Sequence, residues 1–227
     1  MTELHDKTVT LIQARMGSTR LPGKVLEDIA GSPVLARCVT AASASRLTDA
    51  VCVATSTEVA DDAVAAWCTD NGVSVFRGSE TDVLTRMCEA ARAAEATTVV
   101  RLTADCPLHD PSVIDQVIWF YRATGADYAS NTHPSTWPDG LDVEVFSMAA
   151  LERAQREADL PSEREHVTRW MRANASQLRT ETLICPLPDL HRRRWTLDTP
   201  DDLARLRKIS ERLAPGELPS LLAVLAA

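Results

Sequence analysis

Runs of β-branched and aliphatic residues alternate with amphipathic stretches along the first 124 residues. The apolar runs predict strands near residues 8–13, 50–55, 73–76 and 97–102, and the stretches between them predict helices. Strands that alternate with helices in this way are typical of a mostly parallel sheet with helices on both faces. We therefore expect an α/β fold.

Three predicted helices begin with a capping side chain followed by a proline that fits the first turn, at Ser32-Pro33, Asp110-Pro111 and Thr199-Pro200. Asp202 follows Thr199 at the spacing of a capping box. Asn71-Gly72 predicts the end of the helix before it.

The pattern changes after residue 125, where shorter strands are predicted near 127–130, 141–146 and 178–183. We interpret this part as a mixed-sheet extension of the main sheet. No internal repeat or low-complexity linker separates it from the rest. We therefore expect one domain over residues 1–227.

The composition limits the classes of function. A chain of 227 residues with 45% hydrophobic residues can bury the core of one large α/β domain. The net charge of -8 argues against a nucleic-acid-binding surface. The chain shows neither a signal-peptide pattern nor an apolar run long enough to span a bilayer, so we expect a cytoplasmic protein with no membrane partner. Its six cysteines are scattered without a C-x-x-C pair, which indicates neither a disulfide framework nor a zinc site.

Residues 11–26, LIQARMGSTRLPGKVL, lead from an apolar strand into a loop with the cations Arg15, Arg20 and Lys24. Exposed backbone N–H groups and cationic side chains suit a polyphosphate ligand. The spacing is not that of a Walker loop. The alternative is an ordinary cationic surface loop.

This string resembles the signature of the CTP-dependent cytidylyltransferases, the family of the CMP-sugar-acid synthetases. It is most similar to the branch of spore-coat polysaccharide biosynthesis cytidylyltransferases. Five more segments match that branch in order: FRGSETDVLTR (76–86), VVRLTADCPLHDP (99–111), PDGLDVEVFS (138–147), EREHVT (163–168) and RWTLDTPDDL (194–203).

The resemblance implies a three-layer Rossmann-like nucleotidyltransferase fold of the nucleotide-diphospho-sugar transferase type. About 1–124 plus 186–227 would form the nucleotide-binding core, and about 125–185 the acceptor and dimerisation extension of a homodimer. The implied reaction transfers CMP from CTP to a small acidic acceptor (a sugar acid, sugar phosphate or phosphonate), releases pyrophosphate and uses Mg2+. Two alternatives are a non-catalytic nucleotide-binding protein and a glycosyltransferase of related fold, although the latter would need a D-x-D motif where TADCP offers only Asp105.

Two aspartates follow predicted strands. Asp105 comes after VVRLT, and Asp198 comes after a short predicted strand, WTL. Open α/β sheets bind ligands at the carboxyl ends of their strands, so both side chains could face one crevice. Each could instead be a turn or cap residue. The resemblance implies that both bind the metal, and that Arg15 and Lys24 complete the catalytic set.

The resemblance also implies a set of nucleotide-binding residues: Gln13, Ala14, Arg15, Gly17, Ser18, Arg20, Lys24, Arg77, Gly78, Ser79, Thr103, Ala104 and Asp105. It implies that the base pocket is formed by main-chain groups near Gln13 and Ala14, by residues 77–79, and by Thr103 and Ala104. Ala104 stands where the family commonly has glycine. Asp82 has two interpretations, since it could cap the following helix or orient Arg77.

Candidates for the acceptor site are Asn131, Asp142, Glu144, Glu163 and His166, with His133 and Arg192 to Arg194 as weaker ones. Alternation places Asp142 and Glu144 on one face of a strand, either facing the acceptor or on the solvated face of an edge strand. Ser162 and Glu165 have capping-box spacing, which would leave Glu163 and His166 for function.

Overall fold

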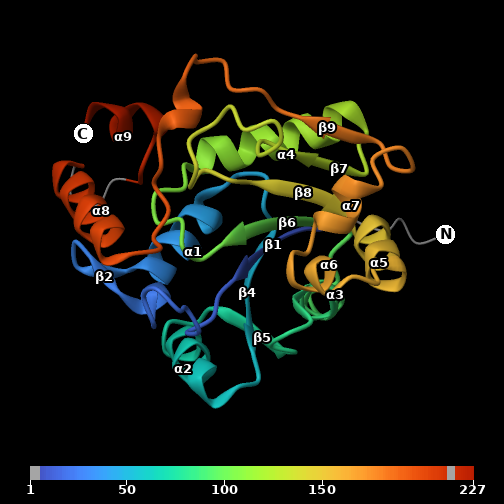
Figure 1. The fold of residues 1–227 in the computed structure, drawn as a ribbon, viewed down its shortest axis with the longest axis horizontal. Coiled ribbons are helices and arrows are strands. Elements are labelled where there is room, and N and C mark those ends of the chain that lie inside the picture. The colour runs from blue at the N-terminus through green and yellow to red at the C-terminus, as the bar shows by residue number, and fades with distance from the viewer. Residues whose placement is uncertain (1–5, 214–217) are drawn as a thin grey trace.

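A seven-stranded sheet with the order β5-β4-β1-β6-β8-β7-β9 forms the centre of the computed structural model, which describes residues 6–213 and 218–227 (Figure 1). Its strands are β1 (Thr8–Gln13), β4 (Ala50–Ser56), β5 (Ser74–Gly78), β6 (Thr98–Thr103), β7 (Tyr128–Ser130), β8 (Glu144–Ser147) and β9 (Thr180–Thr182). A separate small hairpin consists of β2 (Asp28–Ile29) and β3 (Ser32–Pro33).

The pairing makes the sheet mostly parallel. β1 pairs in parallel with β4 and β6, and β4 pairs in parallel with β5. β8 runs antiparallel to both β6 and β7, while β9 is parallel to β7. The predicted α/β class and the four strands predicted before residue 125 are confirmed.

Two predictions about strands are wrong. β8 lies inside the sheet between β6 and β7, so it is not an edge strand, and it begins only at Glu144. Residues 195–197 form no strand, and the only bridge there joins Arg194 to Asp139. Neither outcome was visible in the local pattern, because both depend on pairing between distant segments.

The helices lie on both faces of the sheet (Figure 1). They are α1 (Val34–Ala44), α2 (Asp62–Asp70), α3 (Val83–Ala93), α4 (Pro111–Thr124), α5 (Met148–Glu157), α6 (Pro161–Glu165), α7 (Arg169–Ala173), α8 (Pro200–Arg212) and α9 (Leu221–Ala226). Within the described ranges, none is both long and apolar enough to cross a bilayer.

The predicted helix starts are confirmed at two of three places. Asp110 caps α4 by accepting from the N–H of Ser112, and Thr199 forms a capping box with Asp202 at the start of α8. The prediction for Ser32 is wrong: Ser32 pairs with Ile29 in the β2–β3 hairpin, so its backbone is extended, and α1 begins after it without a side-chain cap.

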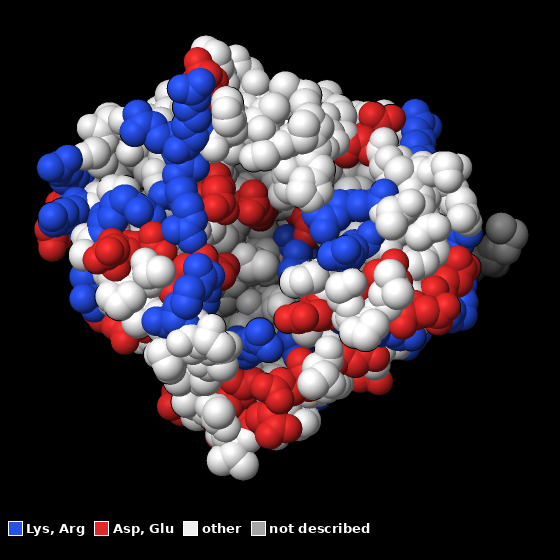
Figure 2. Space-filling view, viewed as in Figure 1, with Lys and Arg blue, Asp and Glu red and all other residues white. Residues whose placement is uncertain are grey.

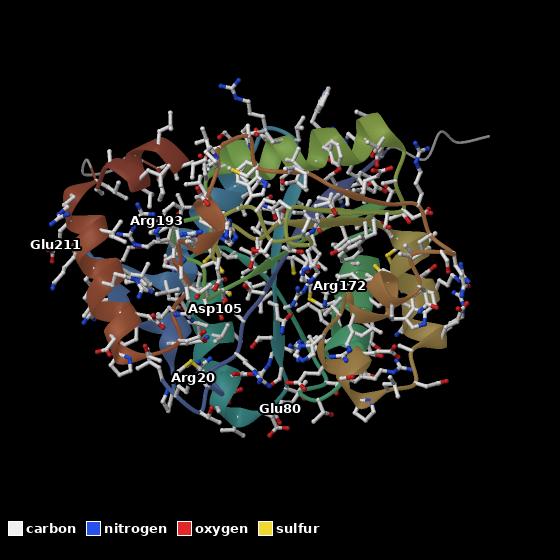
Figure 3. The ribbon with its side chains drawn as sticks, turned by 45° about the horizontal axis from the view of Figure 1, so that its top comes forward. Arg20, Glu80, Asp105, Arg172, Arg193 and Glu211 are labelled. Carbon is white, nitrogen blue, oxygen red and sulfur yellow. The ribbon has the colours of Figure 1, made fainter. Side chains whose placement is uncertain are left out.

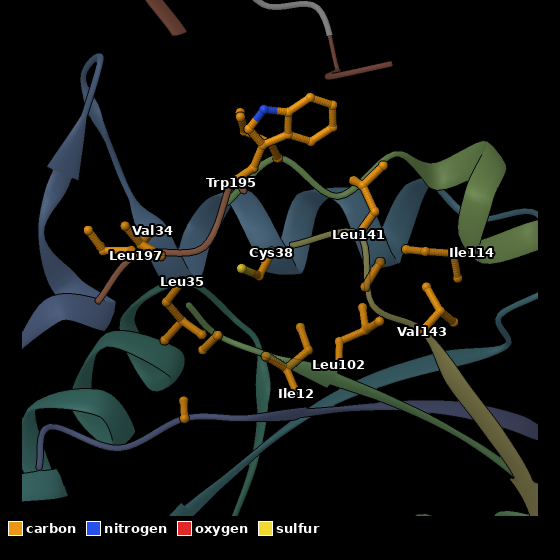
Figure 4. Packing of buried hydrophobic residues seen from close by; sticks show 14 of the residues in the cluster. Ile12, Val34, Leu35, Cys38, Leu102, Ile114, Leu141, Val143, Trp195 and Leu197 are labelled. Carbon is orange, nitrogen blue, oxygen red and sulfur yellow. The ribbon is translucent and has the colours of Figure 1, made fainter. Parts of the chain in front are cut away.

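Each face of the sheet has its own buried cluster. One packs Leu35 of α1 and Ile114 of α4 against the sheet and includes Leu141 and Trp195 from later segments (Figure 4). The other packs α3, α5 and α7 against the opposite face. Because the core strands are parallel, the loops after β1, β4, β5 and β6 meet at one edge of this layer, where open sheets bind ligands.

Candidate active site

A cavity of about 610 Å³ opens at the carboxyl ends of β1 and β6. Figure 2 shows the surface hollowed there, with charged side chains of both signs around the opening. The lining residues are Gln13, Arg15, Gly17, Ser18, Thr19, Arg20, Lys24, Val25, Glu80, Thr103, Ala104, Asp105 and Asp198. Nine of the thirteen nucleotide-site residues predicted from the sequence line the cavity, and a tenth, Ala14, is buried next to Gln13 at the end of β1.

The cationic loop after β1 is held in place from beneath. The backbone N–H of Met16 donates to Asp61 Oδ1 at 2.6 Å, and Asp61 also accepts from the N–H and hydroxyl of Ser56 at the end of β4. The Gly23 N–H donates to the Met16 carbonyl at 3.0 Å, with Gly23 at φ 75, which favours glycine. Asp61 is 3% exposed and was missed in the sequence; its one signal is its position soon after an apolar strand.

Lys24 joins the two aspartates predicted to share a crevice. Its Nζ lies 2.8 Å from Asp105 Oδ2 and 2.8 Å from Asp198 Oδ1, and Arg20 lies 3.0 Å from the same Asp198 oxygen. Arg15 lines the cavity without an ion pair to any residue in the described ranges. The loop therefore brings two cations to the two carboxylates and places a third, Arg15, on the cavity wall.

Burial and ion pairing act in opposite directions on this cluster. Burial alone would lower the pKa of Lys24, but Asp105 and Asp198 raise it overall. Burial alone would raise the pKa of Asp105, but Lys24 lowers it overall. Both groups are therefore charged at neutral pH.

The donor set of Asp105 and Asp198 fits a divalent cation with oxygen ligands. Oxygen atoms from both carboxylates converge on the single Lys24 ammonium, so both face one small volume. Mg2+ commonly takes one or two carboxylates and completes its shell with water and substrate phosphates. No group of three or more metal-binding side chains occurs in the described part of the chain, so phosphate oxygens would have to supply the remaining ligands.

Asp198 is oriented by an arginine on its other side. Arg194 donates to Asp198 Oδ2 at 2.5 Å and to Asp202 Oδ1 at 2.7 Å, and it pairs with Asp139 at 3.3 Å. Gly140 makes this arrangement possible, because a Cβ there would lie 2.8 Å from the Trp195 backbone carbon. The extension loop therefore packs directly on the segment that presents Asp198.

The comparisons with known proteins agree with this geometry. The family model described as cytidylyltransferase matches residues 9–214. The chain belongs to the cytidylyltransferase family. The members of this family are nucleotidyltransferases.

Individual relatives of this cytidylyltransferase cover most of its length. It is 34% identical to the spore coat polysaccharide biosynthesis protein SpsF of Bacillus subtilis, over 93% of this chain and 88% of that one. It is 31% identical to a 3-deoxy-manno-octulosonate cytidylyltransferase of Anaeromyxobacter dehalogenans, over 88% of this chain and 96% of the other.

The solved structures extend the agreement to the fold. A cytidylyltransferase from Leptospira borgpetersenii superposes with a TM-score of 0.91 at 32% identity, over 98% of this chain and 94% of that one. A CMP:2-keto-3-deoxy-manno-octonic acid synthetase in complex with CTP superposes with a TM-score of 0.66 at 21% identity, over 90% and 98% of the two chains, which shows the fold alone. The nucleotidyltransferase fold implied by the resemblance is confirmed.

The wall that would face the base of a nucleotide in this cytidylyltransferase differs from expectation. Arg77 donates to the carbonyls of Ser56 and Glu58 and pairs with Asp62, so its guanidinium does not line the cavity. Gly78 and Ser79 also lie outside the lining, which Glu80 reaches instead. A base contact by residues 77–79 stays a prediction.

Asp82 and a buried arginine stabilise that wall. Asp82 accepts from the N–H and hydroxyl of Thr85, which favours the cap interpretation over the orientation of Arg77. Arg86 is fully buried and donates to the carbonyls of Ser79 and Glu80. Arg86 was missed because arginine in an amphipathic helix is usually exposed.

Two of the acceptor candidates are buried and hydrogen-bonded within the fold of this cytidylyltransferase. Glu144 is 4% exposed and pairs with Arg101. Both interpretations drawn from the sequence, an acceptor contact and a position on a solvated face, are therefore wrong for Glu144. Asn131 is fully buried and bonds the backbone of Leu141 and Val143 through both amide atoms. These side chains support the extension from inside.

The assignment of the helix cap in α6 is also wrong. Glu163, not Glu165, accepts from the N–H groups of Asp159 and Leu160 at 3.2 Å each. The helix begins at Pro161, so the third helical position, which reaches back to the start, belongs to Glu163. Ser162 and Glu165 form no capping box.

The remaining acceptor candidates stay open to solvent or face the cavity's carboxylates. His166 is exposed, and His133 is exposed and contacts Arg172 of α7. Asp142 is partly buried: burial, then Asp139, Glu144 and Asp105, raise its pKa to about 7 despite the opposing charge of Arg101. Arg192 and Arg193 are exposed, whereas Arg194 holds Asp198.

Proposed function

We propose that this cytidylyltransferase transfers CMP from CTP to a small acidic acceptor, a sugar acid, sugar phosphate or phosphonate, with release of pyrophosphate. The observation that carries the proposal is the position of Lys24 in the cationic loop: its ammonium donates to both Asp105 and Asp198 at 2.8 Å each. Cations and carboxylates at one point suit a triphosphate and a metal ion together. The relatives named for cytidylyl transfer support the nucleotide.

The chain's own residues would act mainly by position and charge. An acceptor oxygen attacks the α-phosphorus, a new P–O bond forms, and the bond to the β-phosphate oxygen breaks so that pyrophosphate leaves. Arg15 and Lys24 line the cavity and neutralise negative charge that accumulates on the phosphate oxygens. The thiol nearest the site, Cys106, is buried, and burial followed by Asp105 raises its pKa well above the ordinary value, so a thiolate nucleophile is not needed or favoured.

Asp105 and Asp198 would hold Mg2+. When bound, the ion would neutralise charge on the triphosphate and orient its α-phosphate. Lys24 and Arg20 already contact these carboxylates, so they would shift toward the phosphates as the ion takes its place.

Charge around the hollow supports an acidic acceptor. Figure 2 shows Lys and Arg side chains near α6 and α7, across the hollow from Asp and Glu side chains. In Figure 3, Arg172 from α7 lies to the right of Asp105, which follows β6. We propose that the acidic group of the acceptor binds on the α7 side, within the extension of residues 125–185.

The same extension would also carry a homodimer interface within the single domain. Leu160 and Ile184 of this region are 56% and 53% exposed, which is apolar surface that a second copy could cover. Light scattering during gel filtration would give twice the chain mass, and a mass of one chain would contradict the dimer.

Nucleotide binding tests the proposal without knowledge of the acceptor. The melting temperature should rise with CTP and Mg2+ more than with UTP, ATP or GTP, because a ligand that binds the native state stabilises it. Lys24→Ala should abolish the shift, whereas exposed Lys208→Ala should retain it. Selectivity for another nucleotide would overturn CTP as the substrate, and pyrophosphate release with candidate acceptors would then distinguish transfer from binding alone.

A further inference from the structure

The side chain of Gln13 reaches the floor of the cavity from the last residue of β1. Its neighbours across the sheet are Ala54 on β4 and Thr103 on β6. Arg101 lies two residues before Thr103 on β6, opposite Leu11, so its side chain is on the same face of the sheet as that of Gln13.

Arg101 fixes which end of the Gln13 amide faces the ligand. Arg101 Nη2 donates to Gln13 Oε1 at 2.8 Å. Because a guanidinium has donors and no acceptor, the amide oxygen must face Arg101 and the NH2 group must face away. Within residues 6–213 and 218–227, no side chain or carbonyl accepts a hydrogen bond from this NH2 group.

Arg101 is itself held by a buried set of partners. Its Nη1 pairs with Glu144 Oε2, and Glu144 Oε1 accepts from the Tyr128 hydroxyl at 2.7 Å and the Thr168 hydroxyl at 2.6 Å. Glu144, Tyr128 and Thr168 are 4%, 3% and 2% exposed. Burying an ion pair is costly and adds little net stability, so a gain in stability does not explain why this pair is buried. Here the pair makes the Gln13 amide a donor of fixed direction.

The order of the strands indicates which part of a nucleotide passes Gln13. β1 lies between β4 and β6, with β5 beyond β4. We place the base beside Glu80 after β5, next to residues 77–79, and the α-phosphate beside Asp105 after β6, where the metal would bind. The ribose connects these two parts, so it would cross the end of β1.

We propose that the Gln13 amide NH2 donates a hydrogen bond to a ribose hydroxyl of the bound nucleotide, and that Arg101 is the residue that positions it. The inference rests on the proposed function, since it takes CTP as the ligand. It makes Gln13 a determinant of ribonucleotide specificity through its side chain. It also gives the buried Arg101 and Glu144 pair a role in nucleotide selection.

Calorimetric binding of CTP, 2′-deoxy-CTP and 3′-deoxy-CTP with Mg2+ tests the proposal. One hydrogen bond corresponds to about three- to tenfold in affinity, so the native chain should prefer CTP over one deoxy analogue by about that factor. Gln13→Ala should bind CTP and that analogue equally, while exposed Gln116→Ala should keep the preference.

The outcomes separate the two proposals. If the native chain binds no CTP, the proposed function fails. If it binds CTP but Gln13→Ala retains the preference, or weakens CTP and both analogues equally, the role of Gln13 is overturned. Arg101→Lys keeps a charge near Glu144 without the planar fork, so it should bind CTP with the preference reduced; an unchanged preference would overturn the positioning role of Arg101.

Discussion

Two charged clusters lie next to each other, one beyond the ends of β1 and β6 and one on β6, β7 and β8, and they differ in what remains available to a ligand. Lys24, Asp105 and Asp198 line an open cavity, and their side chains are 13%, 28% and 20% exposed. Glu144 is buried, and both of its oxygens are used by Arg101, Tyr128 and Thr168. The first cluster can exchange its internal contacts for phosphate and metal contacts, whereas both oxygens of the carboxylate in the second are already used within the protein.

The comparison separates carboxylates that the sequence motifs group together. Both sets occur in segments matched to one family, but Asp105 and Asp198 line the cavity and Glu144 does not. A carboxylate whose partners are all buried supports the fold, and one whose partner is a cation lining a cavity can exchange that partner for a ligand. The predictions below test this division.

Glu144→Ala should have the largest effect of these variants, a loss of stability. It leaves the Arg101 guanidinium buried without its counter-ion, which typically costs about 3–5 kcal/mol in the free energy of unfolding. Chemical denaturation would measure the loss, and exposed Glu165→Ala should change the unfolding free energy by less than about 0.5 kcal/mol. Equal losses in the two variants would place Glu144 among ordinary surface residues and end the comparison.

Asp105→Asn should have the second largest effect, a loss of turnover. Removing a charged group that acts on the reacting phosphates typically costs about a hundredfold or more in rate. Pyrophosphate release with an accepted substrate would measure it, with exposed Asp201→Asn as the control. An Asp105→Asn enzyme of full activity would refute the metal and phosphate role of Asp105.

Asp142→Asn should have a smaller effect that depends on pH. The raised pKa of about 7 means that the native state holds the Asp142 proton more tightly than the unfolded chain, whose ordinary Asp pKa is about 3.9. Stability therefore falls as pH rises between these two values, and asparagine removes that loss. Between pH 4 and pH 7 the free energy of unfolding of the variant should rise relative to that of the native chain by at least about 1 kcal/mol. Above pH 8 the difference should stay constant.

Melting temperatures across this range would measure the gain. The groups that act on Asp142 are Asp139, Glu144 and Asp105, which raise its pKa, and Arg101, which lowers it. A constant difference between the two proteins at every pH would show that Asp142 is not protonated in the native state at neutral pH.

The sequence predicted what depends on local pattern. The parallel strands, the caps at Asp110 and Thr199, and the place of Asp105 after β6 could be inferred from spacing and local pattern. Asp198 does meet Asp105 at Lys24, although the strand expected before Asp198 does not form. The resemblance to known motifs supplied the family. These predictions succeeded because each depends on a short segment or on a rule that holds for every parallel sheet.

The remaining features depend on contacts between distant segments. Glu144 is buried because β8 inserts between β6 and β7, and Asp61 anchors Met16 across 45 residues. The cap moved from Glu165 to Glu163 because α6 begins at Pro161, only two residues from the expected start. Such shifts are below the resolution of a pattern in one sequence.

The most direct test of the division between the clusters measures two quantities in the same two variants. Glu144→Ala should melt roughly 10 °C lower without ligand, yet still rise in melting temperature with CTP and Mg2+. Asp105→Asn should melt close to the native chain without ligand and lose most of the rise with CTP and Mg2+. The reverse pattern, with Asp105→Asn unstable and still responsive to CTP and Glu144→Ala stable and unresponsive, would contradict the account.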